Sequence, residues 1–364
     1  MKISAALPTG VAALLFESAR QRRKTEERLV ALLQGAGYSE VILPILDYLE
    51  PYEALLTPAS RSELYRFIDR DGEQLALRAD FTPMLARLLA PRLAGMPLPL
   101  RVYYRGDVVR YEEERAGRQR EFYQVGAELL GIAGEAAERE ILLLFMDALA
   151  PTESEEIQVV MGFAGALDRL LLDADVEDPV GLAAAVARRE RGPVRRACPR
   201  LLAVVESGLP DRPDDLGPEA AGRLRALLAV CDELADIFPA ARVTVDLAEF
   251  ARHSLDPRLT VEAGGRSYYD GVVFRAYAGA GALPVGGGGR YDSLFRRLGA
   301  EVPAVGFSLS LERLLALTPP SPFSRHRERG EEDGTGGGAP LPVTGEGSGV
   351  RAHVAEEKTE EVKP

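Results

Sequence analysis

Residues 101–131 read RVYYRGDVVRYEEERAGRQREFYQVGAELLG, and this stretch decides the fold and where a function is sought first. Two strand-like runs, 101–112 and 121–130, flank a charged loop centred on Gly117, which predicts a β-hairpin. Side chains alternate between the two faces of a strand. If the hairpin pairs in register, four polar residues converge on one surface of a sheet: Arg110, Glu112, Gln124 and Glu128.

These four polar side chains indicate a ligand or a fixed polar network. Burying such groups without partners costs several kcal/mol, so buried polar groups are nearly always hydrogen-bonded. An ion pair between Arg110 and Glu112 is the simpler interpretation of those two residues alone. The addition of Gln124 and Glu128 on the adjoining strand favours a ligand pocket.

The composition of the 364-residue chain is that of a globular protein, with 46% hydrophobic and 27% charged residues. A net charge of −12 argues against a surface that coats nucleic acid and leaves room only for a local basic patch. Pro8 and Gly10 interrupt the apolar N-terminal stretch, which favours a strand and turn over a signal peptide. No apolar run is long enough to span a bilayer, so we expect a cytoplasmic protein without a membrane partner.

The cysteines and histidines do not form a metal site. Cys198 and Cys231 are well separated, which suggests neither a disulfide framework nor a zinc site and fits a reducing compartment. His253, His326 and His353 lack the spacing of metal ligands. We therefore expect no metal and no histidine-based catalytic centre.

Hydrophobic periodicity predicts an α+β fold. Helices are expected at 11–34, 81–90 and 135–149, with Asp80 or Thr82 able to cap the second. Further strands are expected near 38–46, 73–78, 157–161, 241–246, 268–276 and 305–309, which together suggest a mostly antiparallel sheet flanked by helices. A helical insertion is expected at about 163–240, where prolines from Pro179 to Pro213 break the helical pattern.

The composition changes at Thr318. Residues 318–364 are rich in Pro, Gly and Glu and hold few large apolar side chains. Such a segment cannot bury enough surface to offset the entropy of ordering, so we expect a disordered tail after a folded core of residues 1–317.

Three segments, in order, resemble the three motifs of class II aminoacyl-tRNA synthetases. The segment GYSEVILPILDYLEPY (37–52) resembles the dimer-forming first motif, with Pro44 at its proline position. The hairpin resembles the second motif, with Arg110 and Glu112 as its Arg-x-Glu, and residues 286–314 resemble the third, with Arg313 as its arginine. Together with LRADFT, QVGAE, YYDGVVF and GGRYDSL, they resemble the histidyl-tRNA synthetase core over roughly the first 317 residues.

This resemblance implies a class II synthetase-like core with a pocket for histidine. Asp80, Thr82 and Gln124 would hold the α-amino group, because an ammonium prefers carboxylate, hydroxyl and amide oxygens. Glu128 and Tyr269 would read the imidazole. Adjacent strand residues point to opposite faces, so Tyr269 is preferred over its neighbour for direct contact. The complete implied histidine-binding set is Asp80, Thr82, Arg110, Gln124, Glu128, Tyr268 and Tyr269.

A nucleotide or anion site is implied next to this pocket. Arg110 would face a carboxylate or phosphate, and Phe122 and Arg313 would contact an adenine ring if ATP binds. Glu112 belongs to the same possible site. The glycines at 286–289 would let the backbone approach a ligand closely, although a flexible turn is the simpler interpretation of such a run.

Three departures from the synthetases bear on function. The synthetases carry Arg-Gly-Leu-Asp before the paired tyrosines, whereas Gly264 stands at the arginine position here and Ser267 at the aspartate position. Losing a cation that stabilises developing phosphate charge costs on the order of 3 kcal/mol or more of transition-state stabilisation. The amino-binding carboxylate is shortened to Asp80 in LRADFT, and we expect the tail in place of the anticodon-binding domain.

With these departures the chain resembles the ATP phosphoribosyltransferase regulatory subunits, a family paralogous to the synthetases. The resemblance implies a non-catalytic subunit without a cofactor that acts in the first step of histidine biosynthesis. It would bind L-histidine for feedback inhibition and activate a short catalytic subunit in a hetero-octamer, with homodimers formed through 37–52 and no tRNA bound. Two alternatives stay open: a divergent histidyl-tRNA synthetase lacking the anticodon-binding domain, and a free-standing amino-acid sensor.

Overall fold

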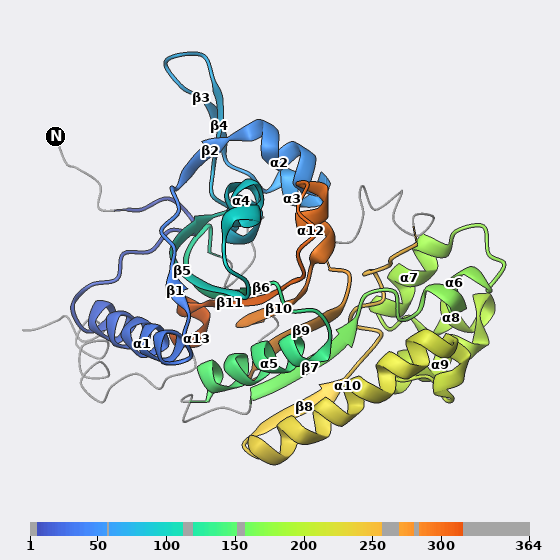
Figure 1. The fold of residues 1–364 in the computed structure, drawn as a ribbon. Coiled ribbons are helices and arrows are strands. Elements are labelled where there is room, and N and C mark those ends of the chain that lie inside the picture. Colours follow the sequence, from blue (N-terminus) through green and yellow to red (C-terminus); the bar gives the residue numbers. More distant parts are fainter. Residues whose placement is uncertain are drawn as a thin grey trace, which may run out of the picture. The chain divides into compact units, whose positions relative to one another are not determined.

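The computed structural model describes residues 6–56, 58–111, 119–150, 157–256, 269–279 and 284–315. Its centre is an eight-stranded sheet in the order β1-β5-β6-β11-β10-β9-β7-β8, in which β1–β5 and β7–β8 are parallel and the other pairs antiparallel (Figure 1). This mostly antiparallel sheet confirms the predicted α+β class. The strands are β1 (Ser39–Glu40), β5 (Leu100–Val109), β6 (Glu121–Leu130), β7 (Ile157–Phe163), β8 (Ala241–Val245), β9 (Val272–Ala278), β10 (Gly286–Arg290) and β11 (Ala304–Ser310).

The predicted hairpin is formed by β5 and β6. Gly106 lies opposite Gln124 and Val102 opposite Glu128, so Gln124 and Glu128 share a face of β6 as expected. The first strand ends at Val109, earlier than predicted, and Arg110 follows it with its amide donating to the carbonyl of Arg120. Glu112 lies outside the described residues.

The two faces of the sheet carry different helices (Figure 1). Helices α1 (Phe16–Gly35), α5 (Glu135–Leu149) and α13 (Leu311–Leu315) pack on the face that presents Tyr103, Val125 and Leu129. The opposite face of the hairpin presents Tyr104 and Phe122 to α4 (Phe81–Leu89). Near α4 lie α12 (Asp292–Arg297) and a small sheet, β2-β4-β3, made of Leu46–Tyr48, Gln74–Leu77 and Arg66–Ile68.

Helix α1 begins five positions later than its apolar pattern predicts. The chain from Val11 to Leu15 is not helical, and Leu15 is extended. The reason lies just before it, where the carbonyl of Gly10 accepts a hydrogen bond from the amide of Arg120 at 2.7 Å. The chain is therefore tied to the start of β6 before the helix can form.

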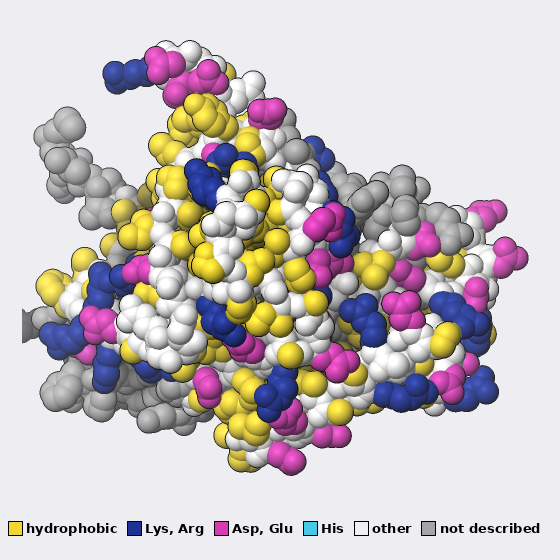
Figure 2. All heavy atoms as spheres, viewed as in Figure 1, with side chains coloured by type: hydrophobic (Ala, Val, Ile, Leu, Met, Phe, Trp, Pro, Cys, Tyr) yellow, Lys and Arg dark blue, Asp and Glu magenta, His cyan; other side chains and the backbone are white. Residues whose placement is uncertain are grey.

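The helical insertion lies between β7 and β8. Leu182, Val186 and Val204 belong to the same hydrophobic core as the strand residues Val159 and Phe274, so the insertion packs onto the sheet. Figure 2 shows acidic and basic side chains interspersed over the surface that carries these helices. The helices are α6 (Asp168–Leu172), α7 (Pro179–Ala187), α8 (Arg191–Ala197), α9 (Leu202–Ser207) and α10 (Pro218–Ile237).

Two other expectations concern membrane-spanning helices and the C-terminal tail. None of the described helices is long and apolar enough to cross a membrane. The expected tail, 318–364, lies outside the described residues, so the boundary of the core at 317 stays a prediction.

Candidate functional site: a buried carboxylate beneath a small cavity

Glu128 is the most unusual side chain of the site, because it is a carboxyl group that is only 1% exposed. Its Oε1 accepts hydrogen bonds from the hydroxyls of Thr82, at 2.8 Å, and Tyr104, at 3.2 Å, and its Oε2 accepts one from the hydroxyl of Tyr291. Burial raises the pKa of Glu128 to about 8, although the three hydroxyls favour the charged form and pull the pKa back. The nearby charge of Asp80 raises the pKa further.

Two glycines make the room that Glu128 and its partners need. A Cβ atom on Gly306 would lie 1.5 Å from the Glu128 Oε2, and one on Gly126 would lie 2.5 Å from the Tyr104 ring. Any larger residue would collide with the carboxyl group or with its hydroxyl donor. The glycine of QVGAE therefore has a packing role, and so does that of AVGF in β11.

A cavity of about 40 Å³ lies above this carboxyl group. Its lining includes Asp80, Thr82 and Tyr269 and also Gly287 and Gly288. These glycines belong to β10, which pairs with a strand on each side, so the interpretation of 286–289 as a flexible turn is wrong. The backbone approaches the cavity here because no side chain intervenes.

Asp80 occupies the N-cap position of α4, but its side chain makes no capping hydrogen bond. Its carboxyl group instead lines the cavity, where its charge raises the pKa values of Tyr104 and Glu128 after the larger effect of burial. Thr82, the second residue of the same helix, donates to Glu128 rather than capping. The capping role considered for both residues is therefore not seen, and both side chains serve the cavity.

Gln124 lies on the face of β6 that it shares with Glu128, outside the lining of the cavity. Its Nε2 donates to the Ser308 hydroxyl at 2.7 Å, and Ser308 is a lining residue. The Oε1 of Gln124 is buried and has no partner among the described residues. A buried amide oxygen in this state can accept a hydrogen bond from a donor that enters the site.

Arg110 and Arg313 meet at one aromatic ring. The Arg110 guanidinium carbon lies 5.3 Å from the centre of the Phe122 ring, and that of Arg313 lies 5.7 Å from it. Arg110 also donates from Nε to the carbonyl of Ala79 at 2.5 Å, and Arg313 donates to that of Pro284 at 3.0 Å. Two cations at one ring suit an anionic group, and a base stacking on Phe122 would compete with them.

The two tyrosines of YYDGVVF are only partly described. Tyr269 lines the cavity, and burial raises its pKa. The preference for it over Tyr268 stays a prediction. The Tyr269 ring lies 5.7 Å from that of His253, and burial lowers the pKa of His253 to about 4, so that this imidazole is neutral at pH 7. Tyr268 and Gly264 lie outside the described residues.

The sequence analysis missed two hydroxyl donors to Glu128. Tyr291 lies within GGRYDSL, which carried the family resemblance, but it received no role. Tyr104 lies on the hairpin face of Gln124 and Glu128 and was also given no role. The alternation of β5 was the signal available for Tyr104. Within the described ranges, no group of three or more His, Cys, Asp or Glu side chains could hold a metal ion.

Comparisons with known proteins place this site in a family. Residues 10–314 match the family model described as histidyl-tRNA synthetase. The chain is 35% identical over 327 residues to the ATP phosphoribosyltransferase regulatory subunit of Moorella thermoacetica, a match that covers 85% of this chain and 81% of that protein. It is 32% identical over 337 residues to the histidine–tRNA ligase of Thermococcus kodakarensis, covering 85% and 73%.

A solved structure gives the same fold. A chain of the ATP phosphoribosyltransferase HisG:HisZ complex from Thermotoga maritima superposes with a TM-score of 0.59 at 21% identity, covering 80% of this chain and 97% of that one. At this identity the likeness concerns the fold, and the sequence relatives decide the family. The chain therefore belongs to the histidyl-tRNA synthetase family, among the ATP phosphoribosyltransferase regulatory subunits.

Proposed function

We propose that this chain is the regulatory subunit of an ATP phosphoribosyltransferase, acting in the first step of histidine biosynthesis. It binds L-histidine in the cavity above Glu128, and this binding changes the activity of a separate catalytic subunit. The names of its relatives support this assignment, and so does the complex named for the Thermotoga maritima structure. Histidine can regulate only through different affinities for the active and inhibited assemblies.

The buried state of Glu128 is the observation that carries the proposal. Three hydroxyls donate to its carboxyl group, yet no basic side chain among the described residues forms an ion pair with it. A carboxylate held in this way is incompletely compensated, and a ligand with a basic N–H group would complete it. Imidazole fits in either protonation state, because it accepts from the protonated acid or donates, as imidazolium, to the carboxylate.

Other polar groups in the cavity and near it suit the rest of a histidine molecule. Asp80 and Thr82 offer oxygens to an ammonium group, and the free Oε1 of Gln124 offers another acceptor. Arg110 and Arg313 supply positive charge for a carboxylate or a phosphate. This placement supports the histidine and anion roles that the family resemblance implied.

The absence of catalysis is proposed on the sequence. Gly264 stands where the synthetases carry an arginine next to the reacting carboxylate and phosphate. Losing such a cation costs on the order of 3 kcal/mol, or more than a hundredfold in rate. A pocket of this kind retains its ligand but does not activate it.

A homodimer is proposed through the first-motif segment. Ile42 is 88% exposed and Ile68, on the neighbouring small sheet, is 71% exposed. Figure 2 shows hydrophobic side chains gathered over the surface that β2 to β4 form. Apolar side chains this exposed on a strand-rich surface indicate an interface. The other exposed apolar residues of this surface are Ile45, Leu46, Tyr48 and Phe67.

Calorimetric titration with L-histidine, with and without the catalytic subunit, tests the proposal. We expect binding to the wild-type chain and a weakening of about 1–3 kcal/mol in Glu128→Ala, because this variant removes the acceptor for the imidazole. The matched control is Glu301→Ala, which removes a carboxylate from an exposed ion pair with Arg296. Equal histidine affinity in Glu128→Ala and wild type would disprove the role of Glu128.

The alternative is a histidyl-tRNA synthetase, which the 32% identity to a histidine–tRNA ligase keeps in view. A synthetase would catalyse histidine-dependent exchange between pyrophosphate and ATP, whereas a regulatory subunit would stimulate its catalytic partner and show no exchange. Exchange at the rate of a synthetase control would overturn the regulatory proposal. Histidine binding without an effect on the catalytic subunit would favour a free-standing sensor.

A further inference from the structure

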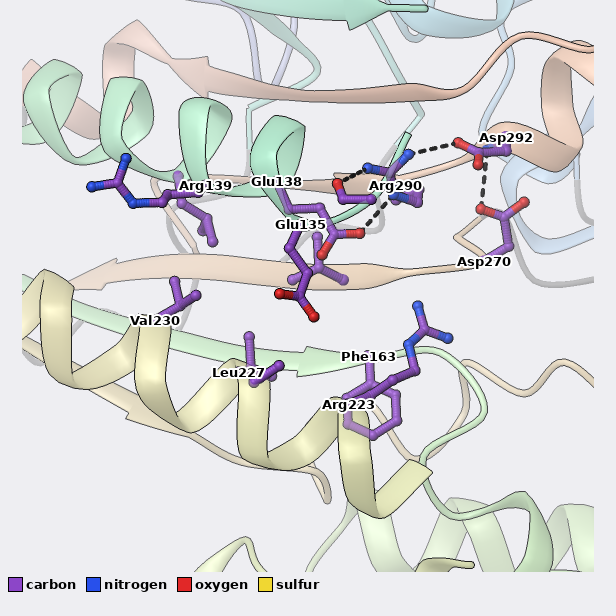
Figure 3. Close-up of a pocket in the computed structure, with 14 residues that line it drawn as sticks. Glu135, Glu138, Arg139, Phe163, Arg223, Leu227, Val230, Asp270, Arg290 and Asp292 are labelled. Carbon is purple, nitrogen blue, oxygen red and sulfur yellow. Dashed lines mark hydrogen bonds and ion pairs between the residues drawn. The ribbon is translucent and has the colours of Figure 1, made fainter. Parts of the chain in front are cut away.

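A second and larger cavity, of about 390 Å³, lies between α5, α10 and the ends of β9 and β10 (Figure 3). Its volume is within the range of sites for small molecules, roughly 300–1,000 Å³. It is separate from the cavity above Glu128, with which it shares no lining residue. The histidine proposal therefore gives it no role.

One wall of this second cavity is fixed by a buried ion-pair network. Arg290 is only 5% exposed and donates to Glu138 at 2.6 Å, to the carbonyl of Gly134 at 2.7 Å and to Asp292 at 3.3 Å. Asp270 accepts from the amide of Asp292 at 3.0 Å. These charged groups hold one another, so they form the frame of the cavity rather than its means of holding a ligand.

Three charged side chains of the lining stay outside this network. Arg139 is paired with Glu233, and the other two, Arg223 and Glu135, have opposite signs. Arg223 comes from α10 and lies over the Phe163 ring, with its guanidinium carbon 5.4 Å from the ring centre. Glu135 comes from the first turn of α5. Among the described residues neither side chain forms an ion pair, and Figure 3 shows them projecting from opposite walls of the cavity.

Apolar side chains also line the cavity. Leu142 of α5 and Val272 of β9 are buried, and Leu227 and Val230 come from α10. A guanidinium held against an aromatic ring presents its N–H groups in a fixed plane, which suits a carboxylate. An occupant is therefore expected to carry an anion at Arg223, a cation at Glu135 and an apolar body between them.

We propose that this cavity binds a small zwitterion with an apolar side chain, of the class of the hydrophobic amino acids, with its carboxylate on Arg223 and its ammonium facing Glu135. The site is independent of Glu128. Glu135 is exposed and Arg223 is half-buried, so water screens their charges and the affinity is weaker than that of a fully enclosed site.

Three probes of one shape separate the contributions of the two charges. L-Phenylalanine carries both charged groups, 3-phenylpropanoate lacks the ammonium, and 2-phenylethylamine lacks the carboxylate. Ligand-observed NMR on the full chain at millimolar probe concentration is expected to rank L-phenylalanine first. Equal binding of all three probes, or no binding of any, would overturn the proposal.

Substitutions assign the two charges. Arg223→Gln is expected to weaken L-phenylalanine and 3-phenylpropanoate about tenfold and to leave 2-phenylethylamine unchanged. Glu135→Gln is expected to weaken L-phenylalanine and 2-phenylethylamine and to leave 3-phenylpropanoate unchanged. Arg225→Gln, on the same helix but paired with Asp214 outside the cavity, is the matched control and should change nothing. If Arg223→Gln binds all three probes as the wild type does, the site is not where we place it.

The two cavities are distinguished with Glu128→Ala. This variant should lose affinity for L-histidine and retain L-phenylalanine binding. Arg223→Gln should retain L-histidine binding and lose affinity for L-phenylalanine. Loss of phenylalanine binding in Glu128→Ala alone would place the probe in the first cavity and refute the second site. If neither variant loses histidine binding, the role of Glu128 in the proposed function is refuted and the second site is left standing.

Discussion

The two cavities differ in how their buried charges are compensated. The larger one has Arg290, a buried cation that carboxylates and a carbonyl surround. The smaller one has Glu128, a buried acid that hydroxyls surround but that no described basic side chain pairs. The larger cavity therefore has a stable frame without a ligand, whereas we propose that a ligand completes the smaller one. Incomplete compensation of a buried charge, rather than volume, marks the proposed histidine site.

The largest expected effect comes from breaking the compensated network. Arg290→Met leaves the carboxylates of Glu138 and Asp292 without their cation in a partly buried place. Breaking a buried pair on one side costs about 3–5 kcal/mol, so the free energy of unfolding should fall by about that amount. Urea unfolding followed by circular dichroism measures it.

A control for this loss removes an arginine from an exposed pair. Arg225→Gln breaks the pair with Asp214, whose side chains are 59% and 83% exposed. Exposed pairs contribute roughly 0–1 kcal/mol, so this variant should unfold close to the wild type. Equal stabilities of the two variants would contradict the structural role given to Arg290.

The buried carboxyl group of Glu128, which no described basic side chain pairs, predicts that stability depends on pH. The pKa of Glu128 is about 8 in the folded chain, against an ordinary 4.5. The folded state therefore holds a proton that the unfolded state has lost, and its stabilising effect is full below pH 4.5 and disappears as the pH rises to about 8. The expected loss is on the order of 5 kcal/mol, comparable with that in Arg290→Met.

Glu128→Gln isolates this dependence, because the amide does not titrate. His253 acts in the opposite direction, since burial lowers its pKa to about 4 and stability then rises with pH up to its ordinary 6.5. The difference between wild type and variant cancels His253. A difference in unfolding free energy that stays constant between pH 5 and 8 would show that burial does not raise this pKa.

A smaller effect is expected from filling the space beside Glu128. Gly306→Ala places a methyl group 1.5 Å from Oε2, so the carboxyl group or β11 must shift. Overpacking of this kind costs about 1–3 kcal/mol, and histidine affinity should fall with it. Chemical unfolding and calorimetry measure the two losses.

The same substitution on a helix is the control for Gly306. Gly222 lies in α10 with nothing within 4 Å of an added Cβ. Gly222→Ala should therefore stabilise the chain by about 0.5–1 kcal/mol, as alanine favours a helix. If both variants changed stability in the same direction, helix and strand propensities rather than packing would explain Gly306.

Much of the fold was predictable because its signals are local. The alternation of the hairpin gave the shared face of Gln124 and Glu128, and hydrophobic periodicity gave α5 almost to the residue. The start of α1 was not predictable, since a hydrogen bond from the distant Arg120 holds Gly10. Sequence patterns do not contain such long-range contacts.

The site was predictable to the extent that the family motifs name its residues. Asp80, Thr82, Glu128 and Tyr269, which the resemblance named, all line the smaller cavity. Their role in binding histidine stays a prediction. Tyr291 follows β10, and Glu128 lies in β6. Their contact depends on β10 and β6 both pairing with β11, one on each side, which only the sheet order reveals. The second cavity had no sequence signal, because its lining comes from separate parts of the chain.

The smallest effect that still distinguishes the two cavities concerns the hydroxyls on Glu128. Tyr291→Phe removes the donor to Oε2, which has no other partner among the described residues, and should cost about 1 kcal/mol of stability. Tyr104→Phe removes a longer bond to Oε1, which keeps Thr82 at 2.8 Å, and should cost roughly half as much. Both variants should raise the pKa of Glu128, because each removes a bond that favours the charged form. Titration of the Glu128 carboxyl carbon by NMR would follow this shift. An unchanged pKa of Glu128 in Tyr291→Phe would mean that the Tyr291 hydroxyl does not stabilise the charged form of Glu128.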